Sequence, residues 1–349
     1  MIALLLIGTA AASIIAATAL LGAREPATAP SPEVRALARI DGDCGFRRLS
    51  IVHRQIAPVP PSQWRQTPDC GYIEHEDLRI ERFEHQGPHG SYRLEFTKRP
   101  NERPTPFIIY LTGGPRSMTT GVGPGPLRLQ LPVRLAEQYA TAVVAPAYLG
   151  TWTRSLYPAT DTEAAAEEVA SLIERLRSLH PRARLAVVAE SAAALVAMRL
   201  LLRQSVPTVL LSPSPTGLRE LVTDPRGTDL ASDARSHRIR FNRYRPGTQE
   251  IEAVTATAEE QVAAFAGDDY DRSLADMIRR RPPQRRDCLA IVHGTADRRV
   301  RVSRFSEVRS AVPSMTIYAI EGMGHGPSSE EQAGALASAV RRVMPEHCS

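Results

Sequence analysis

The stretch that decides the fold reads Leu185-Ala-Val-Val-Ala-Glu-Ser191-Ala-Ala-Ala-Leu195. An apolar run of strand length passes directly into a run of helix-forming residues. A strand that turns sharply into a helix strains the backbone at the turn and exposes the side chain of the residue there, Ser191. Only small residues fit two positions to either side, and Ala189 and Ala193 stand there in place of glycine. The stretch predicts that Ser191 is a nucleophile. The alternative is a serine N-cap of the helix.

Further continuous apolar runs predict strands that are buried on both faces. They lie at 106–111, 142–145, 208–211, 289–292 and 315–320. Strands inside a parallel sheet have this character because helices cover both of its faces. Segments 78–83 and 91–97 instead alternate apolar and polar residues around a turn, which predicts a hairpin. We therefore expect an α/β fold with a mostly parallel central sheet flanked by helices.

Apolar residues at helical spacing lie between these runs. Thr160 and Glu163 have the spacing of a capping box, and an amphipathic helical pattern follows them. Helices are also expected at 192–202 and 328–343. Residues 213–287 lie between two expected core strands and are too many for a simple connection. We expect this segment to be a cap or lid, helical at 249–265 and 274–280.

Two later strand ends carry the partners that a serine nucleophile needs. Asp297 ends the sequence His293-Gly-Thr-Ala-Asp297, and His325 stands between two glycines after the run at 315–320. A hydroxyl needs a base, and the base needs an orienting carboxylate. Both residues follow strands at the sheet edge where sites form in open α/β sheets. The order serine, aspartate, histidine predicts a catalytic triad. His293 is predicted to shape the Asp297 loop.

A glycine pair after the run at 106–111 predicts a site for a developing negative charge. Acyl transfer needs backbone N–H groups aimed at the oxyanion, and small residues let the backbone approach the substrate. The expected donors are the N–H groups of Gly114 and Ala192. A plain Gly-Pro turn is the alternative. No Gly-Lys-Ser/Thr sequence follows, and the histidines and cysteines lack metal-ligand spacing. No cofactor and no metal are therefore expected.

Residues 77–345 resemble the α/β-hydrolase superfamily. The Gly113-Gly114-Pro115 loop and Glu190-Ser191 are most similar to its prolyl-oligopeptidase-like and prolyl-aminopeptidase-like serine peptidases. The resemblance implies the α/β-hydrolase fold and an acyl-enzyme on Ser191 that water hydrolyses. It also implies that His325 acts as general base and then general acid, while Asp297 holds the imidazolium. Thr112 replaces a histidine that often precedes the glycines. This departure bears on the substrate class more than on the fold.

The first residues predict an exported chain. Residues 2–22 carry no charge, a length that fits either a signal peptide or a membrane anchor over 1–23. A buried helix is the third alternative. Residues 24–76 read as a linker and a Cys/Pro-rich extension. The hydrolase core is then expected in two parts, 77–212 and 288–349, separated by the cap at 213–287.

The cysteines fit an oxidising compartment. Their number is even and their spacing is wide, so disulfides are expected, most simply Cys44–Cys70. Buried free thiols are the alternative. The four cysteines are Cys44, Cys70, Cys288 and Cys348.

The formal net charge of +5 is small for 349 residues, and no nucleic-acid partner is expected. A basic cluster over 235–245 is either a solvated face or an attraction for an anionic substrate or membrane surface. The expected function is that of an exported serine hydrolase acting on a small-molecule ester or peptide. An acyltransferase on the same triad and a non-catalytic binding protein remain alternatives. The sequence leaves the choice between ester and peptide bond, and the oligomeric state, open.

Overall fold

The computed structural model describes the greater part of the chain from residue 65 onward. The predicted signal or anchor at 1–23, most of the extension, Gly114 and three of the cysteines lie outside the described residues. The described ranges are 65–66, 72–75, 78–88, 90–98, 107–111, 113, 131–139, 142–146, 161–223, 238–244, 251–280 and 286–345.

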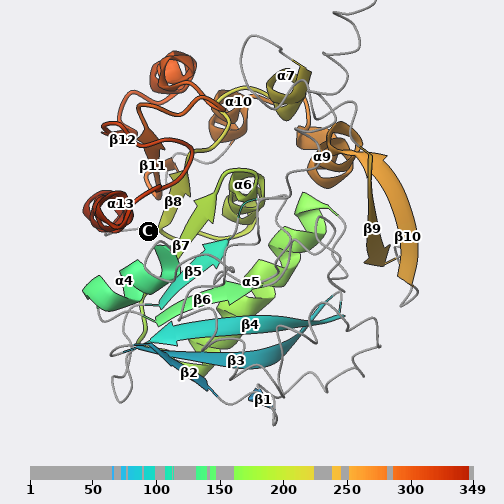
Figure 1. Ribbon diagram of the computed structural model, residues 1–349, viewed down its shortest axis with the longest axis vertical. Coiled ribbons are helices and arrows are strands. Elements are labelled where there is room, and N and C mark those ends of the chain that lie inside the picture. Colours follow the sequence, from blue (N-terminus) through green and yellow to red (C-terminus); the bar gives the residue numbers. More distant parts are fainter. Residues whose placement is uncertain are drawn as a thin grey trace, which may run out of the picture.

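One large sheet organises the described residues (Figure 1). Its strands are β1 (Arg65–Gln66), β2 (Tyr72–His75), β3 (Leu78–Gly87), β4 (Gly90–Lys98), β5 (Phe107–Leu111), β6 (Ala142–Pro146), β7 (Leu185–Glu190), β8 (Thr208–Leu211), β11 (Leu289–Gly294) and β12 (Thr316–Ile320). Their order is β1-β3-β4-β6-β5-β7-β8-β11-β12, and β2 pairs with β3. From β6 to β12 all neighbours are parallel, whereas β1 to β4 pair antiparallel. The expected α/β fold with a mostly parallel sheet and an N-terminal hairpin is confirmed.

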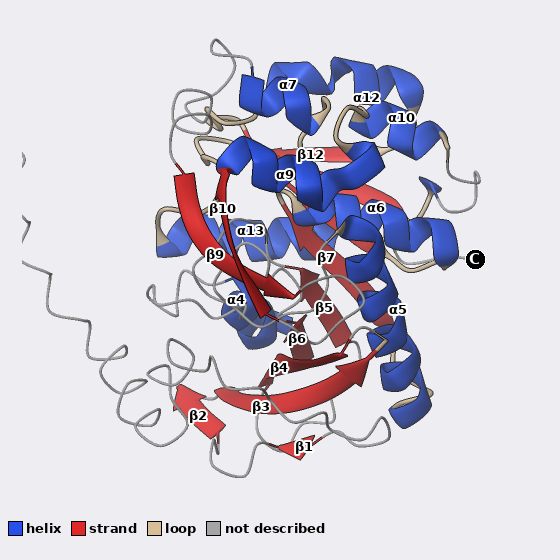
Figure 2. Cartoon of the chain, turned by 90° about the vertical axis from the view of Figure 1, so that its right-hand side faces the viewer, coloured by secondary structure: helices blue, strands red, loops and turns tan. Residues whose placement is uncertain are grey.

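Helices cover both faces of the parallel part of the sheet (Figure 2). The described α-helices are α4 (Leu131–Tyr139), α5 (Thr162–Leu179), α6 (Ala193–Arg203), α7 (Leu218–Thr223), α9 (Ala258–Ala266), α10 (Leu274–Arg279), α12 (Ser306–Ala311) and α13 (Glu330–Val343). Two short 3₁₀ turns, η3 (Gly267–Asp269) and η4 (Val302–Phe305), complete them. The helices α5 and α6 pack on one face, and α4 and α13 pack on the other.

The alternation of side chains along each central strand builds two apolar layers. In β5, Phe107 and Ile109 belong to the layer under α5 and α6, whereas Ile108 and Tyr110 belong to the opposite layer. All five residues of β5 are buried. The apolar runs of β5, β7, β8 and β11 are buried on both faces because successive side chains point to opposite sides of a strand. The same expectation is wrong for β12, which lies at the edge of the sheet and buries only Ile320.

Two sequence-based expectations about helix starts are wrong. The N-cap of α5 is Asp161, whose carboxylate accepts the N–H of Ala164 at 2.8 Å, rather than Thr160. The helix expected over 249–265 begins only at Ala258, after the capping box of Thr257 and Glu260. Residues Ile251–Thr257 instead form β10, which pairs antiparallel with β9 (Arg238–Tyr244). Its β-branched residues favour a strand once a partner strand is present.

The second half of the segment 213–287 shares the apolar layer of α6. Phe265 in α9 and Leu274, Met277 and Ile278 in α10 are buried in that layer. Division of the chain into a core and a cap stays a prediction, but this half of the segment is joined to the core by buried side chains.

One cysteine lies among the described residues. Cys288 is fully buried next to β11. The expectation that the cysteines form disulfides stays a prediction. The Cys44–Cys70 pairing stays a prediction.

Candidate active site

Ser191 occupies the turn between β7 and α6. Its φ of 51° lies in the left-handed region, which costs a residue with a side chain about 1 to 2 kcal/mol. Its N–H donates to the Leu211 carbonyl at 2.8 Å, and its own carbonyl accepts the Ala194 N–H at 3.0 Å. The N-cap position of α6 is Ala192, so the hydroxyl of Ser191 does not serve as a helix cap. The side chain is therefore presented at the carboxyl end of β7.

Three side chains from three strand ends form one hydrogen-bonded chain. Ser191 Oγ lies 3.0 Å from His325 Nε2, and His325 Nδ1 lies 2.8 Å from Asp297 Oδ2. Since a carboxylate only accepts, Nδ1 carries the proton and Nε2 is left to accept the Ser191 hydroxyl. The side chain of Asp297 is fully buried, whereas that of His325 is 19% exposed. The structure thus brings together all three residues of the predicted triad.

The two oxygens of Asp297 have separate partners. Oδ1 accepts the N–H groups of Arg299 at 2.8 Å and Val300 at 3.0 Å, so Oδ2 is left for His325. Burial alone would raise the pKa of Asp297. The hydrogen bond and charge of His325, together with the Val300 N–H, outweigh burial and hold this pKa below its ordinary value. The carboxylate is therefore ionised at neutral pH.

The loops that carry Asp297 and His325 are bound to each other. The N–H of Thr295 donates to the Ile320 carbonyl at 3.0 Å, and that of Ala296 donates to the Met323 carbonyl at 3.0 Å. Gly294 has no room for a side chain, because a Cβ there would lie 2.2 Å from the Met323 carbonyl oxygen. The backbones of these two loops therefore fix the position of Asp297 relative to His325.

The strand β5 is held against the serine turn in a similar way. A Cβ on Gly113 would lie 2.8 Å from the Glu190 carbonyl oxygen and 2.9 Å from Ser191 Cβ. The Tyr110 hydroxyl donates to Glu190 Oε2 at 2.6 Å. Gly114 lies outside the described residues, so its role as an oxyanion donor stays a prediction. The other expected donor, Ala192, lies at the start of α6, where helix N–H groups lack partners within the helix.

Sequence reasoning missed the contacts that support the triad. Tyr110 acts through its hydrogen bond to Glu190, and Gly294 acts through close backbone approach to Met323; neither contact has a local sequence signal. Gly113 belongs to the glycine pair that the sequence indicated, but its approach to Glu190 depends on tertiary packing.

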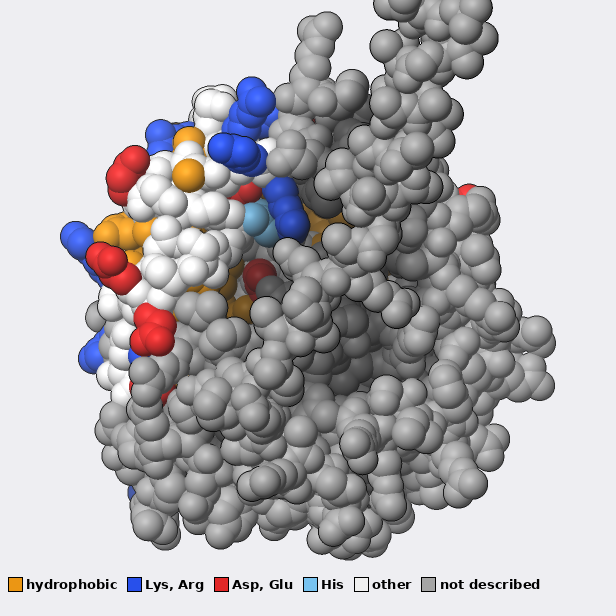
Figure 3. All heavy atoms as spheres, in the orientation of Figure 1, with side chains coloured by type: hydrophobic (Ala, Val, Ile, Leu, Met, Phe, Trp, Pro, Cys, Tyr) orange, Lys and Arg blue, Asp and Glu red, His pale blue; other side chains and the backbone are white. Residues whose placement is uncertain are grey.

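The described side chains on the face drawn in Figure 3 carry charges of both signs, and a histidine side chain lies among them. Within the described part of the chain, no group of three histidine, cysteine or acidic side chains could hold a metal ion. No described helix is both long and apolar enough to cross a bilayer.

Comparisons with known proteins give similar structures but no similar sequence. No family model and no curated protein matches the chain. Acylaminoacyl peptidase from Pyrococcus horikoshii is similar with a TM-score of 0.50 and 12% identity, over 78% of this chain and 42% of that one. The chain thus spans less than half of that peptidase.

Two esterase structures are similar over most of their length. A cold-adapted esterase from an Arctic intertidal metagenomic library has a TM-score of 0.48 and 10% identity, over 81% of this chain and 99% of that one. Carboxyl esterase 2 from the fungus Tuber melanosporum has a TM-score of 0.48 and 14% identity, over 78% and 90%. At 12% identity, the similarity to the Pyrococcus horikoshii peptidase shows the fold alone.

Proposed function

We propose that this chain, which has the α/β-hydrolase fold, is a serine hydrolase that cleaves an ester or peptide bond in a small-molecule substrate. The observation that carries the proposal is the chain of hydrogen bonds from Asp297 through His325 to Ser191, at 2.8 and 3.0 Å. Such a chain is the arrangement that activates a serine hydroxyl.

The geometry supports a two-step reaction. Ser191 Oγ attacks the substrate carbonyl carbon while its proton passes to His325 Nε2, and Asp297 Oδ2 stabilises the imidazolium. The oxyanion accepts hydrogen bonds from backbone N–H groups, of which Ala192 is the described candidate. The leaving group departs with the proton from His325. Water then attacks the carbonyl carbon of the acyl-enzyme and gives one proton to His325. His325 returns a proton to Ser191 Oγ as the carboxylic acid product leaves.

The strained serine favours catalysis over a binding role on the same fold. Backbone strain of this kind costs stability and persists where the surrounding structure enforces it, commonly at active sites. A protein that only binds would gain nothing from holding Ser191 at a φ of 51° within 3.0 Å of a histidine.

Fluorophosphonate labelling of the purified protein tests the proposal. The wild-type protein should be labelled, and Ser191→Ala should abolish labelling while leaving the thermal unfolding transition nearly unchanged. Ser212→Ala is the matched control, because Ser212 is a buried serine at the end of the adjacent strand β8 and also has a positive φ of 44°. Labelling that persists in Ser191→Ala, or is lost in Ser212→Ala alone, would exclude Ser191 as the nucleophile.

Fluorophosphonate labelling does not distinguish a hydrolase from an acyltransferase, because both use the same nucleophilic serine. We expect p-nitrophenyl acetate to release the phenol with turnover in water alone. A single burst, with turnover only after an alcohol or amine acceptor is added, would instead assign an acyltransferase.

The proposal includes export of the chain, on the basis of the uncharged residues 2–22. Mass spectrometry of the mature N-terminus, from cells separated into cytoplasm, membrane and exported fractions, distinguishes a cleaved signal from a retained anchor. Recovery of the intact chain in the cytoplasm would exclude both.

A further inference from the structure

A second histidine lies behind the triad and takes no part in the reaction described so far. His293 is the penultimate residue of β11 and is fully buried, on the same face as Leu289 and Ile291. Its ring packs against that of Phe305, with the ring centroids 4.8 Å apart. Fully buried histidines are uncommon unless their polar atoms are used.

One nitrogen of His293 is used, and the other is not. Nε2 lies 2.6 Å from the Val300 carbonyl oxygen. Because a carbonyl oxygen only accepts, Nε2 carries the proton and Nδ1 is left with a lone pair in the neutral ring. Nδ1 is buried and has no hydrogen-bond partner among the described residues. The ring is thus held in one tautomer.

Val300 connects this histidine to the catalytic acid. Its carbonyl accepts from His293, while its N–H donates to Asp297 Oδ1 at 3.0 Å. The other oxygen, Asp297 Oδ2, lies 3.7 Å from His293 Nε2, which is too far for a hydrogen bond, and 2.8 Å from His325 Nδ1. His293 therefore fixes the residue that holds one carboxylate oxygen while leaving the other oxygen to His325.

We propose that neutral His293 is a positioning residue for the reaction, which holds the Val300 peptide and through it turns Asp297 Oδ2 toward His325. This role rests on the proposed function. Protonated His293 would place a second cation 3.7 Å from Asp297 Oδ2 and would compete with the His325 imidazolium for the same charge. A neutral ring leaves the whole charge of the carboxylate to His325.

The surroundings of His293 favour the neutral form. Burial lowers the pKa of His293, and this effect prevails although the Val300 carbonyl and the charge of Asp297 act in the opposite direction. A charge on His325 lowers this pKa further. Asp297 and His325 are the titratable groups that act on the ring. Phe305 in η4 packs against the ring, and Ala319 is the register partner of His293 in β12, so both of these neighbours are apolar.

Two substitutions separate the hydrogen bond from the shape of the ring. His293→Phe keeps an aromatic ring against Phe305 but cannot donate to Val300. His293→Gln keeps an N–H donor near the position of Nε2 and cannot be protonated. The control is Thr208→Val in the adjacent strand β8, which removes another buried side-chain donor, bonded to the Val206 carbonyl at 2.9 Å.

The readout is the second-order rate constant of fluorophosphonate labelling from pH 5 to 9, together with thermal unfolding. His293→Phe should label about 10- to 100-fold more slowly, since small displacements of a positioned group cost on this order. Its rate should stay below that of the wild type across this pH range, because a displaced Asp297 no longer orients His325. His293→Gln should stay within a few-fold of the wild type. Thr208→Val should lower the unfolding temperature and leave the labelling profile unchanged.

Each outcome of these measurements supports or overturns the positioning role of His293. If His293→Phe unfolds at a lower temperature but labels with the wild-type rate and pH profile, His293 is merely structural and the inference is overturned. A folded His293→Gln that loses as much rate as His293→Phe also overturns it. If His293→Phe does not fold, His293→Asn replaces it, because its shorter amide does not reach Val300. Failure of the wild type to label would overturn the proposed function itself, which keeps the two failures distinct.

Discussion

At the scale of single residues, the site depends on a backbone conformation that costs stability. Ser191 has a φ of 51°, whereas Ala192, the next residue, has a helical φ of −59°. Only glycine adopts the first of these without strain. The strain therefore belongs to the position of the nucleophile rather than to the chemistry of its hydroxyl.

Two inactive variants measure this strain. Ser191→Gly should have a free energy of unfolding about 1 kcal/mol higher than Ser191→Ala, because relief of the left-handed strain exceeds the entropy that glycine adds to the unfolded chain. Ala192→Gly provides the control and should lose stability, since no strain is relieved at a helical φ. Urea unfolding measures all three. Equal stability of the two Ser191 variants would mean that the turn relaxes once the hydroxyl is gone.

At the scale of elements, the backbones of the acid loop and the histidine loop touch at Gly294. A Cβ on Gly294 would lie 2.2 Å from the Met323 carbonyl oxygen and 2.3 Å from that of Gly324, whereas a Cβ on Gly334 in α13 meets only Gln138 Nε2 at 3.6 Å. The first contact joins two strand ends and the second is ordinary packing. These two glycines therefore make a matched pair.

Substitution by alanine should lower the free energy of unfolding at Gly294 and raise it at Gly334. Gly294→Ala should push the His325 loop away from Asp297 and lower the rate of fluorophosphonate labelling at least 10-fold, with a loss of stability. Gly334→Ala should keep the labelling rate and raise the free energy of unfolding by about 0.5 to 1 kcal/mol, because alanine favours a helix interior. A Gly294→Ala protein that labels like the wild type would show that the loops adjust without cost.

The elements could be predicted where a local pattern is enough to determine them. The continuous apolar runs predicted β5, β7, β8 and β11 because burial on both faces leaves no other composition. The run at 315–320 also forms a strand, but β12 lies at the edge of the sheet and most of its residues are exposed or half-buried. The same reasoning placed Ser191, Asp297 and His325 at one sheet edge. It failed at 251–257, because β10 forms only against β9 and neither strand is specified by its own sequence. The closeness of Gly113 to Glu190, and of His293 to Val300, arises from tertiary packing and has no local pattern.

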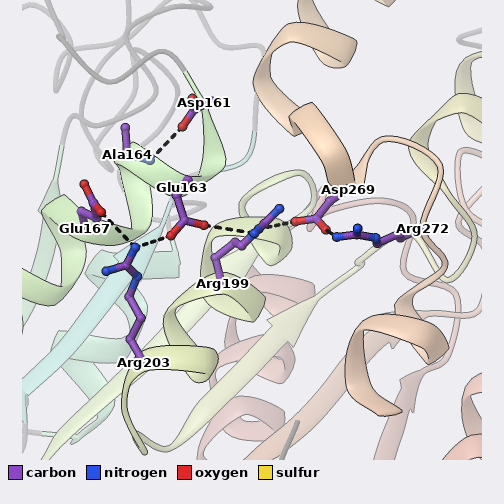
Figure 4. Close-up of polar contacts among 8 residues, drawn as sticks. All are labelled: Asp161, Glu163, Ala164, Glu167, Arg199, Arg203, Asp269 and Arg272. Atoms are coloured by element: carbon purple, nitrogen blue, oxygen red, sulfur yellow. Dashed lines mark hydrogen bonds and ion pairs between the residues drawn. The ribbon is translucent and has the colours of Figure 1, made fainter. Parts of the chain in front are cut away.

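At the scale of the whole molecule, ion pairs join the segment 258–280 to α6, and α6 to α5 (Figure 4). Arg199 of α6 lies between Glu163 of α5 and Asp269 of η3, and Arg272 also pairs with Asp269 at 2.7 Å. The Asp269 side chain is only 5% exposed, and that of Arg199 is 19% exposed. Since α6 begins at the serine turn, this network connects the segment 258–280 to the helix that supports the nucleophile.

Removal of Asp269 tests whether this segment is part of the core or a separate lid. Asp269→Ala leaves Arg199 partly buried beside a single acid, and removal of one member of a buried pair costs about 3 kcal/mol. Because α9, α10 and α6 share one apolar layer, we expect a single unfolding transition at a lower temperature. Asp271→Ala removes the exposed partner of Arg219 from the same segment and should have little effect.

Calorimetry and hydrogen exchange together distinguish the two arrangements. If the segment belongs to the core, Asp269→Ala should increase exchange at 258–280 and in α6 alike, because both lose protection through the same global opening. A separate lid would behave differently, with faster exchange confined to 258–280 and an unchanged main transition. In that case the buried contacts of Phe265 and Leu274 would open while the apolar layer that they share with α6 stays folded. The rest of that layer would then be stable without the residues 258–280.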